Sequence, residues 1–169
     1  MYNATILLEG AQYSFDLFAE QFQKTWQHRV GPYRDENFFG LIVDGMAVGC
    51  ALFRSPLADG ALIQSARENV LWPDAEFQVS KHNAYLTVAL TRAKDPVSAH
   101  TLFSKVIYSL LHQRNAIGVY LRPGLFEPAY YIKCAEVILS KKLPTELWRI
   151  LTLRPFWTLD ARGDIWLRL

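Results

Sequence analysis

Four residues of this sequence carry side chains suited to acid–base chemistry, and three of them stand near predicted secondary-structure ends. His82 precedes an apolar strand, where its imidazole would act as a general base. Glu127 and Tyr130 follow a second apolar strand at the start of a helix, which is where open sheets place ligands. Lys105 lies within an apolar helix. These residues define one hypothesis, a small hydrolase-like enzyme with a rim site at His82 and Glu127, supported by Lys105 or Tyr130.

The same residues also have structural interpretations. A histidine at a sheet rim can hold a loop by hydrogen bonds, and a glutamate in a first helical turn offsets the helix dipole. A lysine in an apolar helix can extend its stem along the flank and keep its charge in water. The enzyme hypothesis therefore requires the four side chains to converge within hydrogen-bond reach in one pocket.

Most sequence signatures of catalysis are absent. No glycine-rich phosphate loop, GxSxG elbow, HExxH or CxxC occurs. His100 and His112 stand twelve residues apart on one predicted helix. At 3.6 residues per turn they fall about 120° apart, so they cannot share a metal ion. The sequence thus predicts no metal and no cofactor, and it favours a non-enzymatic protein.

The end of the chain is rich in tryptophan and arginine, the residues enriched at protein–protein hot spots. Aromatic and basic residues in alternation also suit single-stranded nucleic acid. A third interpretation is that the tryptophans pack a terminal hairpin onto the core while the arginines face water. The predicted partner-binding residues are Trp148, Arg149, Arg154, Trp157, Arg162, Trp166 and Arg168.

Net charge disfavours nucleic acid as the main partner, because +2 is small for a nucleic-acid binder. The charge is unevenly distributed, however. Residues 1–95 hold 8 basic and 11 acidic side chains, and residues 96–169 hold 10 and 5, giving −3 and +5. Nucleic-acid binding through the basic second half therefore remains a further alternative.

The centre of the predicted fold is the stretch 84–121. Residues 84–90 form an apolar strand, Asp95 and Pro96 cap and begin a helix, and residues 117–121 return as a second strand. A strand, a helix and a strand of this length predict a right-handed parallel crossover. Asn115 is predicted to take a left-handed conformation at the end of the helix.

The first half predicts strand, helix, strand, strand, helix and strand, the order of a ferredoxin-like βαββαβ unit. Ser14 caps the first helix, Asp44-Gly45 turns a hairpin, and Gly49 marks a bulge. In the first half, strands are predicted over 4–8, 38–43 and 46–53, followed by a helix over 61–70. After residue 121 we predict a turn at 122–124 and a helix from 127. The last predicted elements are a strand over 148–153, a turn over 161–164 and a strand over 165–169.

Together these elements predict one α+β domain over residues 1–169, with a mixed sheet of about six to seven strands and helices packed on it. Hydrophobic residues make up 51% and charged residues 20%, as in a globular chain. No run of about 18 apolar residues occurs, so no membrane span is expected. Two cysteines in apolar segments and the lack of a signal peptide predict a cytoplasmic protein with free thiols.

Several segments resemble one uncharacterised family of small bacterial proteins, a domain of unknown function. The segments are VDGMAVGCALF with PLADG, ENVLWPDA, KHNAYLTVAL, LFSKVIYSLL, NAIGVYL and GLFEPAYY, and the likeness covers roughly residues 38–154. The family has no agreed activity, so the resemblance transfers no catalytic residue. It implies a cytosolic protein loosely associated with toxin–immunity loci, including type VI secretion, and a further strand region after Leu169. The leading hypothesis is therefore an immunity or adaptor protein that neutralises or escorts a partner such as a secreted toxin.

Overall fold

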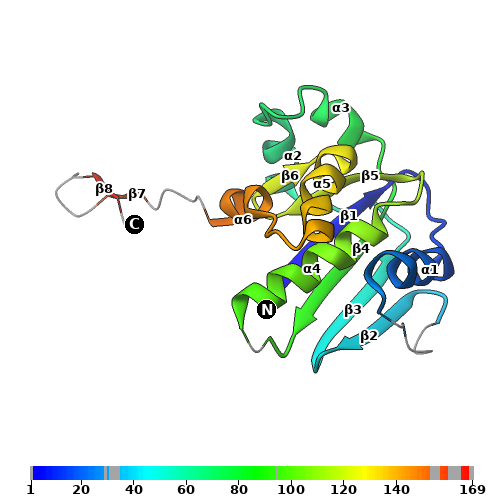
Figure 1. The fold of residues 1–169 in the computed structure, drawn as a ribbon. Coiled ribbons are helices and arrows are strands. Elements are labelled where there is room, and N and C mark those ends of the chain that lie inside the picture. The colour runs from blue at the N-terminus through cyan, green and yellow to red at the C-terminus, as the bar shows by residue number, and fades with distance from the viewer. Residues whose placement is uncertain are drawn as a thin grey trace.

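The protein is built on a six-stranded antiparallel sheet with the strand order β2-β3-β4-β1-β5-β6 (Figure 1). The computed structural model describes residues 2–28, 30, 35–93, 95–152, 157–159 and 165–167, with side chains as far as 148. The α+β class and a sheet of six strands are confirmed. The strands of the sheet are β1 (Tyr2–Leu8), β2 (Phe38–Val43), β3 (Met46–Phe53), β4 (Ala84–Thr91), β5 (Ala116–Leu121) and β6 (Gly124–Phe126).

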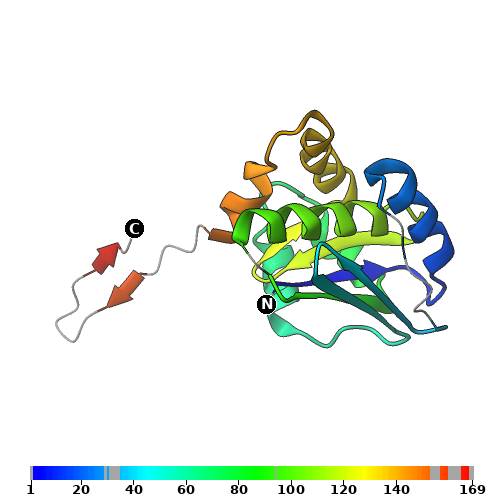
Figure 2. The same cartoon turned by 60° about the horizontal axis from the view of Figure 1, so that its bottom comes forward.

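One face of the sheet is fully covered. Figure 2 shows α1 (Phe15–Trp26), α4 (Pro96–Leu110) and α5 (Pro128–Ala135) lying on the same side of the strands. Alternate side chains of every strand meet the apolar stripes of these helices, because strands present every second residue to one face. A short 3₁₀ helix, η1 (Glu136–Ser140), and helix α6 (Thr145–Thr152) follow α5.

The opposite face is covered at one end only. Helices α2 (Gly60–Arg67) and α3 (Ala75–Ser80) pack against β5 and β6, with Trp72 between them. The Trp72 ring lies so close to Gly118 that a Cβ atom built there would approach it to 3.4 Å. This second core buries Leu7, Tyr120 and Leu125. Over β2, β3 and β4 no helix lies on this face within the described part of the chain.

Several local predictions are confirmed. The Ser14 side chain accepts a hydrogen bond from Leu17 N–H and caps α1. The Asp95 carboxylate accepts from Ser98 N–H at 2.8 Å, and Pro96 begins α4. Residues 44 and 45 have φ angles of 51° and 78°, as the two-residue hairpin between β2 and β3 requires.

The predicted parallel crossover is wrong, and the sheet is antiparallel throughout. β4 and β5 do run in the same direction, but β1 lies between them and pairs antiparallel with both. The helix α4 therefore joins two strands that are not neighbours. The fully buried Ile6, Leu7 and Leu8 explain why β1 takes this central place.

The ferredoxin-like arrangement of the first half is not confirmed. The elements follow the predicted order, except that two helices, α2 and α3, stand where one was expected. In the sheet, however, β1 pairs with β4 and β5 and does not pair with β3.

Three smaller predictions are also wrong. Asn115 is not left-handed; its amide instead donates to the carbonyl oxygens of Gly10 and Gln12. Gly49 marks no bulge, because the pairing of β3 with β2 and with β4 is regular. Residues 148–153 were expected as a strand, but α6 extends to Thr152, and Leu147 of this helix is buried in the core.

The C-terminal strand prediction is confirmed in part. β7 (Trp157–Leu159) and β8 (Ile165–Leu167) pair antiparallel in a two-stranded sheet of their own. The predicted turn at 161–164 lies outside the described residues. Among the described helices, none has the length and apolar character needed to cross a membrane.

Candidate protein-binding surface

His82 is fully engaged in holding a loop. Its Nδ1 donates to Val79 O at 2.5 Å, and its Nε2 accepts from Leu57 N–H at 3.0 Å. The two contacts are satisfied together by the neutral ring with the proton on Nδ1. His82 therefore ties the β3–α2 connection to the end of α3, which is the structural role weighed for it against general-base chemistry.

Glu127 and Tyr130 lie at the start of α5. Glu127 is exposed at the N-cap position without a side-chain capping bond, and it borders a small hollow beside Trp72 and Gln78. Tyr130 stacks on Phe126 with ring centroids 6.2 Å apart. Burial raises the pKa of the Tyr130 hydroxyl, so this group is a poor base at neutral pH.

Lys105 lies elsewhere, on the helix-covered face of the sheet. Its Nζ is 5.4 Å from the centre of the Trp26 ring and 3.5 Å from His28 Nε2. Burial lowers the pKa of this ammonium group. Because His82 contacts α3 on the opposite face, the structure does not bring the four proposed catalytic side chains into one pocket.

The cysteines offer no alternative nucleophile. Burial raises the pKa of the Cys50 thiol to about 12, which keeps it protonated and inert. Burial also raises the pKa of Cys134, which lies beside Tyr130. Within the described residues no group of three His, Cys, Asp or Glu side chains is placed to hold a metal ion.

Among the predicted partner-binding residues, only Trp148 has a described side chain. It is partly buried against the core: its Nε1 donates to Ser104 Oγ at 3.5 Å, and its ring centre is 5.1 Å from that of His100. Arg149, Trp157 and Trp166 are described as backbone only, in α6, β7 and β8, and Arg154, Arg162 and Arg168 lie outside the described residues.

The His100 side chain of α4 contacts both β1, at the start of the chain, and α6, near residue 148. Its ring packs edge-on against Tyr2 of β1 at 4.6 Å and lies beside Trp148 of α6. Burial lowers the pKa of His100, because the apolar surroundings disfavour the charged ring. Trp148 of α6 therefore packs beside a histidine whose charged form is disfavoured.

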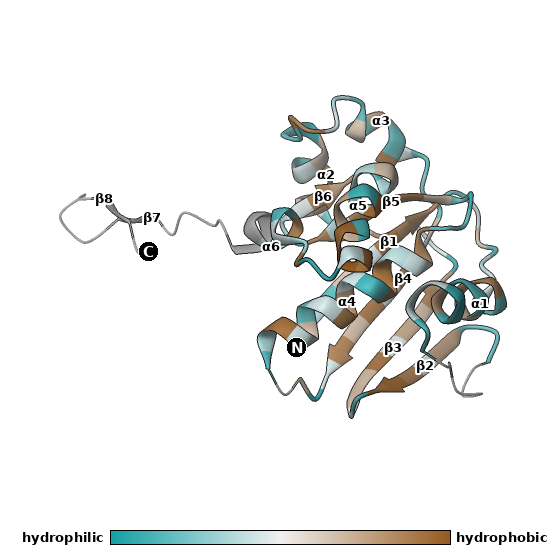
Figure 3. Ribbon diagram, in the orientation of Figure 1, coloured by the Kyte–Doolittle hydropathy of each residue, from teal (hydrophilic) through white to brown (hydrophobic). Residues whose placement is uncertain are grey.

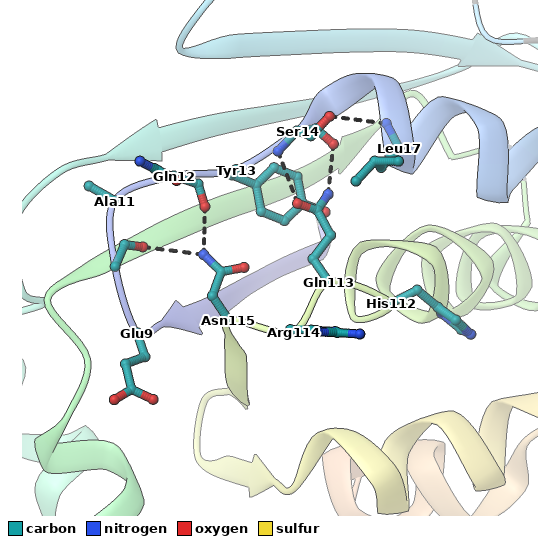
Figure 4. A pocket seen from close by; sticks show the side chains of 11 residues that line it. Glu9, Ala11, Gln12, Tyr13, Ser14, Leu17, His112, Gln113, Arg114 and Asn115 are labelled. Carbon is teal, nitrogen blue, oxygen red and sulfur yellow. Dashed lines mark hydrogen bonds between the residues drawn. The ribbon is translucent and has the colours of Figure 1, made fainter.

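A hollow with a volume of about 910 Å³ lies between the β1–α1 and α4–β5 connections (Figure 4). Some of its polar groups bond to one another. Gln113 Oε1 accepts from Ser14 N–H at 2.9 Å, and Gln113 Nε2 donates to Ser14 O at 2.6 Å. Asn115 holds the neighbouring loop in the same manner. The amides of Gln113 and Asn115 hold the segment before α1 beside the start of β5, so their role in the hollow is structural.

A different surface lies over β2, β3 and β4, and we call it the open face. Every outward side chain on these strands is half-buried or exposed, whereas the inward ones are buried. Figure 3 shows β2 and β3 predominantly in the colours of hydrophobic residues. None of the outward residues is charged; they are Phe38, Gly40, Ile42, Ala47, Gly49, Ala51, Phe53, Tyr85, Thr87, Ala89 and Thr91.

Large apolar side chains stand at the margins of the open face, around a floor of small residues. Phe53 and Tyr85 are cross-strand neighbours whose rings stack 4.9 Å apart at 11°, and Phe53 is 42% exposed. Ile42, at the opposite end, is 69% exposed. The Phe38 ring lies over Gly49, 3.5 Å from where a Cβ atom would stand.

Sequence reasoning missed this surface, although a signal for it exists. In β3 and β4 small residues alternate with large apolar ones. One face of each strand therefore carries large apolar side chains, and the other face carries mostly small ones. Such a pattern is typical of a strand with one packed face and one face that touches something else or water.

Comparisons with known proteins gave no match: no family model, no curated protein and no solved structure matches the chain. Fold and surface together define an antiparallel α+β domain with one covered sheet face and one partly open face.

Proposed function

We propose that this chain is a non-enzymatic protein-binding protein that contacts its partner through the open face. The single observation that carries the proposal is a continuous, uncharged, largely apolar surface on three adjacent strands that no described helix covers. Contiguous exposed apolar patches commonly mark interaction sites. Interface centres are depleted of charge and enriched in aromatic residues, as this face is with Phe53 and Tyr85.

The shape and charge of the open face favour a protein over other ligands. A small molecule needs a concave site that buries most of its surface, and a sheet surface floored by glycine, alanine and threonine is nearly flat. A nucleic acid needs cationic groups at its phosphates, and none of the outward residues of the open face is basic.

The biological role we propose is that of a cytoplasmic immunity or adaptor protein, which occludes or escorts a partner such as a secreted bacterial toxin. This part rests on the resemblance of the segments around residues 38–154 to small proteins near toxin–immunity loci. It also agrees with the dispersal of His82, Glu127, Lys105 and Tyr130, which leaves no converged catalytic site among the described residues.

Site-specific photo-crosslinking tests the proposal. A benzophenone side chain replaces Ala51, at the centre of the open face, or Ile63, a 47% exposed residue of α2 that serves as the control position. In bacterial cells the Ala51 probe should give one adduct of defined mass, and the Ile63 probe should not. The crosslinked protein is then purified and shown to bind the unmodified chain at near-physiological salt.

Equal adducts from both positions, or a purified partner that does not bind, would count against the proposal. Binding to single-stranded DNA that weakens steeply with added salt would instead favour the nucleic-acid alternative, because each phosphate contact releases counterions.

A further inference from the structure

Among the described residues, some outward backbone groups of the edge strand β2 have no hydrogen-bond partner. Residues that flank a two-residue hairpin turn form a hydrogen-bonded pair, and bonded and non-bonded pairs alternate from there. Phe39, Leu41 and Val43 therefore bond to β3, while the backbone groups of Gly40 and Ile42 point away from the sheet. The bond from Leu52 N–H to Asn37 O, 2.8 Å long, fits this alternation.

One end of this edge is already occupied. The Asp35 carboxylate accepts from Phe38 N–H at 2.7 Å, and Asp35 N–H donates to Phe38 O at 2.9 Å. No hydrogen bond within the described part of the chain reaches the outward groups of Gly40 or Ile42. The edge thus offers two consecutive outward residues, and no more, to another strand.

We propose that two copies of the chain pair antiparallel through β2, around a twofold axis at Leu41. Gly40 of each copy then stands opposite Ile42 of the other copy, and each such pair exchanges two backbone hydrogen bonds. This register satisfies every outward group of both residues. A shift by two residues would pair only one of them and would bring the other against Phe38 or Asp44.

The side chains of β2 favour a second copy as the occupant. Ile42 is the most exposed large apolar residue of the sheet, at 69%, and Gly40 has no side chain. Both lie on the open face, two residues apart. Rotation about Leu41 places Ile42 of one copy directly opposite Gly40 of the other, so the projecting apolar side chain meets a residue that has no side chain.

The residues of β2 itself carry none of the features that usually protect an edge strand against pairing. Natural edge strands carry charged side chains, proline or a bulge that prevents edge-to-edge contact. The sequence FFGLIV of β2 has no charge and no proline, and its ladder is regular. Pairing through β2 would extend the sheet across both copies and join their open faces. The inference goes beyond the proposed function and does not depend on it.

Sedimentation velocity of the full chain, from about 1 μM to about 1 mM, tests the inference. We expect a monomer–dimer equilibrium that Ile42→Lys weakens at least about tenfold, because the apolar group is lost and charge is placed over Gly40 of the other copy. Ile63→Lys, which adds the same charge to α2, should leave the equilibrium unchanged. Gly40→Pro, which removes only an outward N–H, should also give a monomer.

Amide hydrogen exchange measured by NMR identifies the contact directly. Protection of the Gly40 and Ile42 amides should rise with protein concentration, while the outward amide of Leu125 on the other edge strand should not change. Circular dichroism and thermal melting confirm that each variant folds.

The inference would be overturned by a monomer at every concentration, by a dimer that survives in both Ile42→Lys and Gly40→Pro, or by concentration-dependent protection at other amides. Protection of Gly40 and Ile42 only after a different protein is added would also overturn it, since β2 would then receive a partner's strand.

Discussion

The two ends of the sheet are built differently. At the β6 end, α2, α3 and Trp72 cover the second face, and the edge is short and occupied: Leu125 O, which points outward, accepts a hydrogen bond from Asn69 Nδ2 at 2.8 Å. At the β2 end no described helix covers the second face, and the outward groups of Gly40 and Ile42 have no partner in the described residues.

This difference shows where the chain can interact without unfolding. Adding a strand or a flat surface at the β6 end would require displacement of α2 and of the second core. At the β2 end the same contact requires no displacement of a described helix; it removes water from apolar side chains and from the backbone of Gly40 and Ile42.

Trp72→Ala should destabilise the fold most strongly. The ring is 5% exposed and packs on Gly118 and Leu7, so its loss leaves a cavity at the covered end. We expect the free energy of unfolding to fall by about 3–5 kcal/mol, as for other buried aromatic residues. Urea unfolding followed by circular dichroism measures this. A loss below about 1 kcal/mol would show that the β6 end is not a true core.

Asn69→Asp should have an intermediate effect. The Asn69 side chain accepts from Leu71 N–H and Trp72 N–H and donates to Leu125 O. Aspartate keeps the acceptors but loses the donor, which leaves the carbonyl unpaired and turns an anion towards it. We expect a loss of about 1–3 kcal/mol. Asn69→Ala, which also removes both acceptors, is the comparison variant, and equal stability of Asn69→Asp and wild type would contradict the account of this edge.

The pH dependence of stability tests the packing of the covered face. Burial lowers the pKa of His100 below its unfolded value of about 6.5. Below that pH the unfolded chain therefore binds a proton that the folded chain resists, so stability is retained above pH 6.5 and falls as the pH decreases. His28 shifts the same way. His100→Phe should flatten the decline in unfolding free energy; an unchanged slope would exclude His100 as its source.

Phe53→Ala should have the smallest effect on stability. The ring stacks on Tyr85 on the open face and is 42% exposed, so it contributes at most about 1 kcal/mol as a cross-strand pair. The same urea measurement applies. A loss as large as that of Trp72→Ala would mean that the open face is packed against something within the monomer.

Local features of the fold could be predicted from the sequence, because they depend on neighbouring residues. The Ser14 and Asp95 caps, the Asp44-Gly45 turn and the apolar strand in β4 were all predictable in this sense. The order of the strands was not. An apolar strand such as β1 can pair with any neighbour, and only the assembled sheet decides that it separates β4 from β5.

The helix α6 illustrates a second limit. Residues around Trp148 alternate loosely and also repeat with helical spacing, and a short segment does not distinguish the two periods. Its contacts with Ser104 and His100 of α4, far away in sequence, favour the helix. The acid–base candidates failed to converge for a related reason: His82 and Lys105 are 23 positions apart in the chain (105 minus 82), but the sheet separates them.

The most direct test of the central claim is the dissociation constant of the partner identified by crosslinking at position 51. Calorimetry compares the wild type with Phe53→Lys, on the open face, and with Ile63→Lys, on α2. The account predicts at least about tenfold weaker binding for Phe53→Lys and an unchanged constant for Ile63→Lys. Unchanged binding by Phe53→Lys, with its fold intact, would contradict it.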